Sequence, residues 1–129
     1  MQSSNDSIKV FLADDSAPIR ERVGAMLSAR AMTVVGEGET PQACIEGILR
    51  SHPDVVVLDI QLEGGSGLEV LKAIRQQDPS IRFVVLSNNS NTAYRKRYLA
   101  EGAFTFLDKS AEFDQLTQAV TAASDRTVH

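Results

Sequence analysis

Apolar residues in this chain gather into short runs, and the stretches between the runs place apolar residues three and four positions apart. Three of the runs are almost unbroken series of Val, Leu, Ile and Phe, as is typical of parallel strands whose sheet is covered on both faces. Both faces of the predicted sheet are therefore expected to be buried. The five runs that predict strands are residues 8–13, 32–37, 55–60, 82–87 and 104–107.

The segments between the runs carry signals for the start and end of helices. Ser16 and Thr40 can cap helices that have a proline in the first turn, and Ser66 with Glu69 forms an S-x-x-E capping box. The predicted helices begin near residues 16, 40, 66, 92 and 112. Five alternations of strand and helix predict one α/β domain. We expect a (βα)5 fold with a doubly wound, parallel, five-stranded sheet in the flavodoxin-like order 2-1-3-4-5.

Length and composition fit one domain of this kind. With 129 residues the chain can bury one core. The domain is expected to span residues 8–123, between a flexible N-terminal tail (1–7) and a C-terminal tail (124–129). A net charge of −4 argues against direct binding to nucleic acid. No apolar run approaches the roughly 20 residues of a membrane span, and the N-terminus lacks an apolar signal region, so we expect a cytoplasmic protein without membrane contact.

Acidic residues follow two of the predicted strands. The first strand runs into Asp14 and Asp15, and the third runs from a series of apolar residues into Asp59. In a sheet of this order, ligands bind beyond the carboxyl ends of the strands where the winding reverses, here between the first and third strands. Neighbouring carboxylates repel one another, and a divalent cation relieves that repulsion. Because oxygen atoms are the ligands that Mg²⁺ prefers, these residues predict a Mg²⁺ site.

Two donor groups end the remaining strands at the same rim of the sheet. Ser87 ends the fourth strand, and Lys109 follows the fifth. A hydroxyl, an ammonium and Mg²⁺ around a carboxylate match a phosphoryl group carried by that carboxylate. Asp59 is best placed as the nucleophile, since carboxylates can form acyl phosphates. Each residue alone has an ordinary explanation, such as a helix cap or a solvated lysine, and only their combination indicates this chemistry.

Four segments, FLADDS, VVVLDIQLEGGSGLEVL, VVLSNN and GAFTFLDKS, together resemble the receiver domain of two-component response regulators. The resemblance covers about residues 8 to 123 and is to the single-domain, chemotaxis-regulator type. It implies that Asp59 is the phosphoacceptor. It also implies that Asp15 and the backbone carbonyl of Gln61 bind Mg²⁺ together with Asp59, while Asp14 acts mostly through metal-bound water.

The same resemblance implies roles for three further residues. Ser87 occupies the Ser/Thr switch position, Lys109 the position of the phosphoryl-binding lysine, and Phe106 the aromatic switch position. The implied function is acceptance of a phosphoryl group from a sensor histidine kinase or a phosphotransfer protein. Phosphorylation would then change the face formed by the fourth helix, fifth strand and fifth helix, to which an unknown output protein binds. The chain is expected to be a signalling protein and not an enzyme, and a homodimer through this face is left open.

Three positions differ from the usual receiver pattern. Glu63 stands where a proline is common, and Phe106 lacks the hydroxyl of a tyrosine. Ser110 replaces a proline that commonly follows the lysine in the cis form. A cis bond before a serine would cost about 2.5–4 kcal/mol. Either that strain is retained, or the loop around Lys109 is rearranged.

Two other functions stay open. A binding module with the receiver fold would work without phosphorylation. The three acids together with Ser87 and Lys109 disfavour it, whereas the changes at Glu63 and Ser110 keep it open. A phosphatase working through an aspartyl phosphate would be expected to carry a general acid two residues after the nucleophile, where this chain has Gln61.

The interpretations of Phe106 and of the basic run at residues 95–97 each have an alternative. Phe106 is alternatively only a core aromatic residue, with Phe104 competing for the inner face of the strand. The basic run at residues 95–97 is interpreted as a solvated helix face, with a partner contact as the lesser hypothesis.

Overall fold

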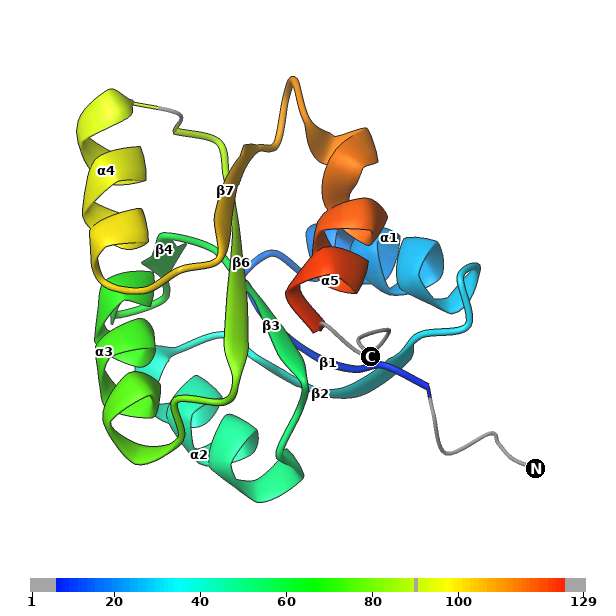
Figure 1. Cartoon of the computed structure of the whole chain (residues 1–129), viewed down its shortest axis with the longest axis horizontal. Coiled ribbons are helices and arrows are strands. Elements are labelled where there is room, and N and C mark those ends of the chain that lie inside the picture. The colour runs from blue at the N-terminus through cyan, green and yellow to red at the C-terminus, as the bar shows by residue number, and fades with distance from the viewer. Residues whose placement is uncertain (1–6, 90, 125–129) are drawn as a thin grey trace.

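A parallel sheet lies at the centre of the fold in the computed structural model, which describes residues 7–89 and 91–124. Every neighbouring pair of its strands is parallel, and the order β2-β1-β3-β6-β7 confirms the predicted 2-1-3-4-5 arrangement. The winding reverses between β1 and β3, at the centre of the sheet (Figure 1). The strands are β1 (Lys9–Ala13), β2 (Thr33–Gly38), β3 (Val55–Leu58), β6 (Arg82–Ser87) and β7 (Thr105–Asp108).

Helices cover both faces of the sheet, as the unbroken apolar strands predict. On one face lie α1 (Ala17–Ser28) and α5 (Leu116–Ser124) (Figure 1). On the other lie α2 (Pro41–Ser51), α3 (Gly67–Gln77) and α4 (Thr92–Ala100). Alternate residues of each strand enter the two cores, because successive side chains of a strand point to opposite faces. None of the helices in the described part of the chain has the length and apolar character needed to cross a membrane.

The predicted caps at the starts of α1, α2 and α3 are present. The hydroxyl of Ser16 accepts a hydrogen bond from the N–H of Ile19 at 3.3 Å, and that of Thr40 accepts one from Ala43 at 3.1 Å. The Glu69 carboxylate accepts a hydrogen bond from the N–H of Ser66 at 3.0 Å, which belongs to the predicted capping box. Such caps each contribute about 1 kcal/mol to helix stability, and here they fix where the strand-to-helix loops turn.

Three short elements were not predicted. β3 ends at Leu58, and the chain then forms an antiparallel hairpin from β4 (Gln61–Leu62) and β5 (Gly65–Ser66) before α3 begins. At the other end of the chain, a 3-10 turn, η2 (Phe113–Gln115), precedes α5, so this helix begins at Leu116 and not near residue 112. Apart from Ser7 and Ser124, the two predicted tails lie outside the described residues.

Candidate functional site

Three aspartates meet where the winding of the sheet reverses. Asp14 and Asp15 directly follow β1, and Asp59 directly follows β3. One carboxylate oxygen of each lies within 4.8 Å of the others. Asp14 is buried, Asp59 is partly buried and Asp15 is exposed, so the group opens to solvent on the side of Asp15. The structure thus brings together the three acidic residues that the strand ends predicted.

Lys109 is the cation of this cluster. Its Nζ donates hydrogen bonds to Oδ2 of Asp14 at 2.9 Å and to Oδ2 of Asp59 at 3.2 Å. Burial alone would lower the pKa of Lys109, but the hydrogen bond to Asp14 and the charge of Asp59 raise it overall. Burial raises the pKa of Asp59, although Lys109 acts in the opposite direction. Three carboxylates beside one ammonium leave an excess of negative charge, which a divalent cation would balance.

Backbone contacts hold the lysine loop beside Ser87. Ser87 is buried at the end of β6, its backbone carbonyl accepts a hydrogen bond from the N–H of Lys109 at 2.8 Å, and its Oγ accepts one from Asn89 at 3.0 Å. The peptide bonds of the described residues are all trans. Asp108 Oδ1 accepts hydrogen bonds from the N–H and the hydroxyl of Ser110, at 2.7 and 2.6 Å. Of the two arrangements open for this loop, it has the rearranged one, and Lys109 still reaches both aspartates.

Arg20 on α1 fixes the position of the Asp14 backbone, a role that the sequence analysis missed. Its Nη1 donates to the carbonyl of Asp14 at 2.6 Å, while Nε and Nη2 pair with Glu37 at 2.8 Å and Glu39 at 2.9 Å. The side chain is only 12% exposed. Arg20 therefore ties the end of β1 to the end of β2. The available signal was an arginine in the second turn of a helix that starts directly after two aspartates.

The loop after Asp59 is closely packed. Oδ1 of Asp59 accepts a hydrogen bond from the N–H of Gln61 at 3.4 Å. A Cβ atom at Gly67 would collide with the backbone carbonyl oxygen of Asp59, so only glycine fits there. Glu63 is exposed in the turn of the hairpin and is not among the three clustered acids.

Phe106 occupies the inner face of β7. It is 1% exposed, whereas Phe104 is 47% exposed, so Phe104 does not compete for the core. The position fits both a core aromatic residue and a switch residue, since a side chain that rotates inward ends in such a place.

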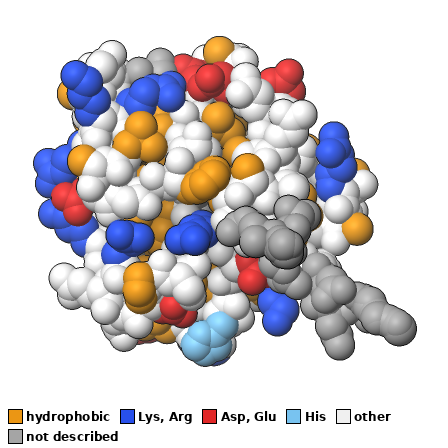
Figure 2. Space-filling view, viewed as in Figure 1, with side chains coloured by type: hydrophobic (Ala, Val, Ile, Leu, Met, Phe, Trp, Pro, Cys, Tyr) orange, Lys and Arg blue, Asp and Glu red, His pale blue; other side chains and the backbone are white. Residues whose placement is uncertain are grey.

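The interpretation of residues 95–97 as a solvated face is wrong for Arg95. Its Nη1 donates to the Phe106 carbonyl at 2.8 Å, and its guanidinium lies 5.1 Å from the centre of the Phe106 ring. Nη2 also lies 3.6 Å from Glu112. Lys96 and Arg97 are exposed, and Figure 2 shows Lys and Arg side chains along the edge of the molecule that α3 and α4 form.

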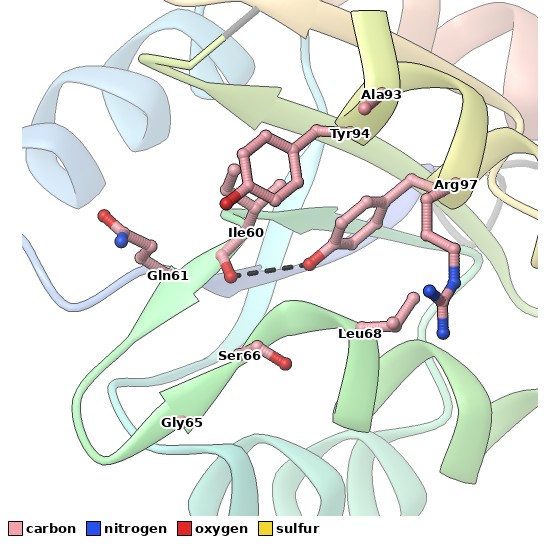
Figure 3. Close-up of a pocket in the computed structure, with 9 residues that line it drawn as sticks. Ile60, Gln61, Gly65, Ser66, Leu68, Ala93, Tyr94 and Arg97 are labelled. Atoms are coloured by element: carbon pink, nitrogen blue, oxygen red, sulfur yellow. Dashed lines mark hydrogen bonds between the residues drawn. The ribbon is translucent and has the colours of Figure 1, made fainter. Parts of the chain in front are cut away.

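Tyr98 on α4 links the loop after Asp59 to Phe106. Its hydroxyl donates to the backbone carbonyl of Ile60 at 3.4 Å (dashed in Figure 3), and its ring packs edge-on against Phe106 with centroids 6.1 Å apart. Burial raises the pKa of Tyr98 to about 12. This role of Tyr98 was not predicted from the sequence. The available signal was a tyrosine among the charged residues of this helix. If such a tyrosine is buried, its hydroxyl needs a hydrogen-bond partner in a neighbouring segment.

Comparison with known proteins gives a consistent result. The family model described as "Response regulator receiver domain" matches residues 10–121. The response regulator GacA of Pseudomonas aeruginosa is 28% identical over 114 residues, which are 88% of this chain and 53% of that protein. The photosynthetic apparatus regulatory protein RegA of Cereibacter sphaeroides is 30% identical over 90% of this chain and 62% of its own length. The chain thus spans little more than half the length of these relatives.

A solved structure agrees in fold along almost the whole chain. The two-component response regulator of the LuxR family from Aurantimonas sp. SI85-9A1 superposes with a TM-score of 0.87 at 27% identity, covering 92% of this chain and 85% of that one. The strand order, the cluster of aspartates at the strand ends and the family match all lead to one assignment. This chain belongs to the response regulator receiver domain family of two-component signalling.

Proposed function

We propose that Asp59 accepts a phosphoryl group from the phosphohistidine of a sensor histidine kinase or a phosphotransfer protein. The observation that carries this proposal is the hydrogen bond of Lys109 Nζ to the Asp59 carboxylate, 3.2 Å long, within a cluster of three aspartates at the reversal of the sheet. In the reaction, an oxygen of Asp59 attacks phosphorus. A new O–P bond forms as the N–P bond breaks, and the imidazole nitrogen keeps the electron pair of that bond.

The residues around Asp59 fit a Mg²⁺ ion. Asp15, Asp59 and the backbone carbonyl of Gln61 are the proposed direct ligands, and Asp14 would act through water. The hydrogen bonding supports this division, because both carboxylate oxygens of Asp14 are occupied, by the Ser16 N–H and by Lys109, whereas Asp15 is exposed. When bound, Mg²⁺ would offset the charge on the phosphoryl oxygens.

Two donors would hold the transferred group. Lys109 would move one of its hydrogen bonds from Asp59 to a phosphoryl oxygen, because hydrogen bonds between an ammonium and an anionic oxygen are strong. The Ser87 hydroxyl lies at the end of the neighbouring strand, and it would donate to a second oxygen. Its Oγ accepts a hydrogen bond from the Asn89 N–H, which does not use the hydroxyl proton that would be donated to the phosphoryl group.

The signal would pass from Ser87 to Phe106 and the face formed by α4, β7 and α5. Phe106 lies inward against Tyr98, and its carbonyl is held by Arg95, so a shift of β7 would move α4 with it. An output protein would bind this face, and a homodimer through it is part of the proposal. The proposed location is the cytoplasm, where a histidine kinase would donate the phosphoryl group.

The proposal is tested by incubating the protein with acetyl phosphate, with and without Mg²⁺, and measuring the intact mass. The wild type and Glu21→Gln, a change at an exposed acid on α1, are expected to gain one phosphoryl group, and only with Mg²⁺ present. Asp59→Asn is expected to gain none. A folded wild type that gains nothing, or an Asp59→Asn variant that gains as much as the wild type, would contradict the proposal.

A phosphorylation-independent binding module is the second candidate. The exposed Glu63 and the trans bond before Ser110 favour it, because both differ from the usual phosphorylated pattern. It predicts partner binding that Asp59→Asn and Mg²⁺ removal leave unchanged. A phosphatase activity is less well supported, since Gln61 offers no proton to a leaving group and receiver domains are signalling modules.

A further inference from the structure

A groove lies between α4 and the loop that follows Asp59. It has a volume of about 460 Å³, and it is bounded on one side by the β4–β5 hairpin with the start of α3, and on the other by α4 (Figure 3). The groove is lined by the side of α4 that faces α3. Arg95, which reaches to β7, belongs to the other side of the helix.

The groove has an apolar lining. Ile60, Leu68 and Tyr98 contribute side chains, and Tyr94 stands at its edge with 44% of its surface exposed (Figure 3). Tyr94 is one of few large hydrophobic residues left exposed in the described part of the chain. Burying such a ring stabilises a complex by about 25 cal/mol for each Å² of apolar surface removed from water. Aromatic residues beside a cavity are typical of the central contacts of protein interfaces.

The lining of the groove carries one positive charge. Arg97 is the charged residue that lines it, and none of its lining residues is acidic. The helix beside it carries Arg95, Lys96 and Arg97 in succession and no acidic residue, although the whole chain has a net charge of −4. Arg97 lies 3.6 Å from Glu101, with 55% of its side chain exposed. Such an exposed pair contributes little to stability, so Arg97 can exchange this partner for another carboxylate at little cost.

We infer that this groove is a docking site for an acidic segment of a partner protein. One bulky apolar side chain of the segment would enter the groove against Tyr94, Leu68 and Tyr98, and a neighbouring carboxylate would pair with Arg97. A groove of this volume takes one large side chain, and the exposed Arg97 beside it suits a carboxylate, so we take an acidic peptide segment as the occupant. This inference does not rest on phosphoryl transfer to Asp59, so the two can fail separately.

The test is a selection from a random dodecapeptide library displayed on phage, with the wild-type chain as bait. Peptides that also bind a Tyr94→Ser/Arg97→Gln double variant are removed. The expected survivors carry a large apolar residue flanked by Asp or Glu. A synthetic survivor should lose at least tenfold in affinity on either single variant, the equivalent of about 1.4 kcal/mol. Its NMR shift changes should include Leu68 and Ala93.

Matched variants separate the groove from general surface effects. Phe104→Ser removes an aromatic residue that is about as exposed as Tyr94 but does not line the groove. Arg30→Gln removes an exposed cation that does not line the groove. Both should bind the peptide as the wild type does, and all five variants should keep the wild-type circular dichroism spectrum.

Three outcomes would overturn the inference. One is a selection without survivors, the second is survivors without acidic residues, and the third is peptide binding that Tyr94→Ser leaves unchanged. Sedimentation velocity tests whether a second copy of this chain occupies the groove. Self-association of the wild type that Tyr94→Ser abolishes would assign the groove to a second copy of this chain instead.

Discussion

The Nζ atom of Lys109 lies 3.2 Å from the Asp59 carboxylate, although the two residues are 50 positions apart in the chain. β3 and β7 deliver them to the same rim of the sheet, with β6 between them. The same ammonium also binds Asp14, from β1. One side chain thus connects three strand ends and compensates part of the negative charge gathered there.

Replacing Lys109 with methionine should destabilise the protein by about 3 kcal/mol, because Asp14 and Asp59 would lose their buried partner. The pKa of Lys109 is raised above its usual 10.5, so its contribution is present at neutral pH and is lost as the pH rises above 10.5. Urea denaturation of Lys109→Met measures the loss. Lys96→Met, a change at an exposed lysine, should stay within about 0.5 kcal/mol of the wild type. Equal stability of both variants would show that the Lys109 pairs contribute nothing.

Replacing Asp59 with asparagine should stabilise the Mg²⁺-free protein, by an amount on the order of 1 kcal/mol. Burial and the neighbouring Asp14 raise the pKa of Asp59 above 3.8, so the folded wild type loses stability as the pH rises from 3.8 to that raised value. The gain from Asp59→Asn should therefore be absent in acid and present at pH 7. Thermal melts over this pH range in EDTA test the sign. A destabilised variant at pH 7 would contradict it, and Glu21→Gln should show no such pH-dependent gain.

Tyr98→Phe should lower the free energy of unfolding by about 1 kcal/mol, since the Ile60 carbonyl would lose a buried hydrogen bond. Tyr94 offers a matched control on the same helix, because its side chain is 44% exposed. Tyr94→Phe should change the free energy of unfolding by less than about 0.5 kcal/mol. Guanidinium denaturation of the two variants makes the comparison, and equal effects would argue against the contact with Ile60.

A methyl group at Gly67 should cost about 1–3 kcal/mol, because it would displace the Asp59 carbonyl or shift the start of α3. Gly67→Ala should also slow phosphoryl acceptance from acetyl phosphate. Gly24 gives the opposite expectation. Nothing lies within 4 Å of a Cβ there, and Gly24→Ala in the interior of α1 should stabilise by about 0.5–1 kcal/mol. Thermal melts of both variants would contradict this account if the two changes had the same sign.

Much of the fold could be predicted from sequence because its signals are local. Unbroken apolar runs indicated buried parallel strands, and Ser16, Thr40 and Glu69 marked the helix starts. The convergence of the three aspartates followed from strand order, since residues after parallel strands meet at one rim. These features need no knowledge of side-chain packing.

Contacts between distant segments could not be predicted in this way. The β4–β5 hairpin depends on two residues in each strand, too few to show a period of two. Arg20 and Tyr98 act through partners that are distant in sequence, and Arg95 turned out to bind the Phe106 carbonyl instead of water. Long polar side chains choose among several partners, and that choice is decided only once the layers are packed.

The central claim is that Asp59 itself carries the phosphoryl group, and reductive trapping tests it most directly. Borohydride reduces an aspartyl phosphate to homoserine, which peptide mass spectrometry locates in the sequence. After treatment with acetyl phosphate and Mg²⁺, the account predicts homoserine at position 59 of the wild type and nowhere else. Homoserine at Asp14 or Asp15, or at no position in a folded and Mg²⁺-loaded protein, would contradict it.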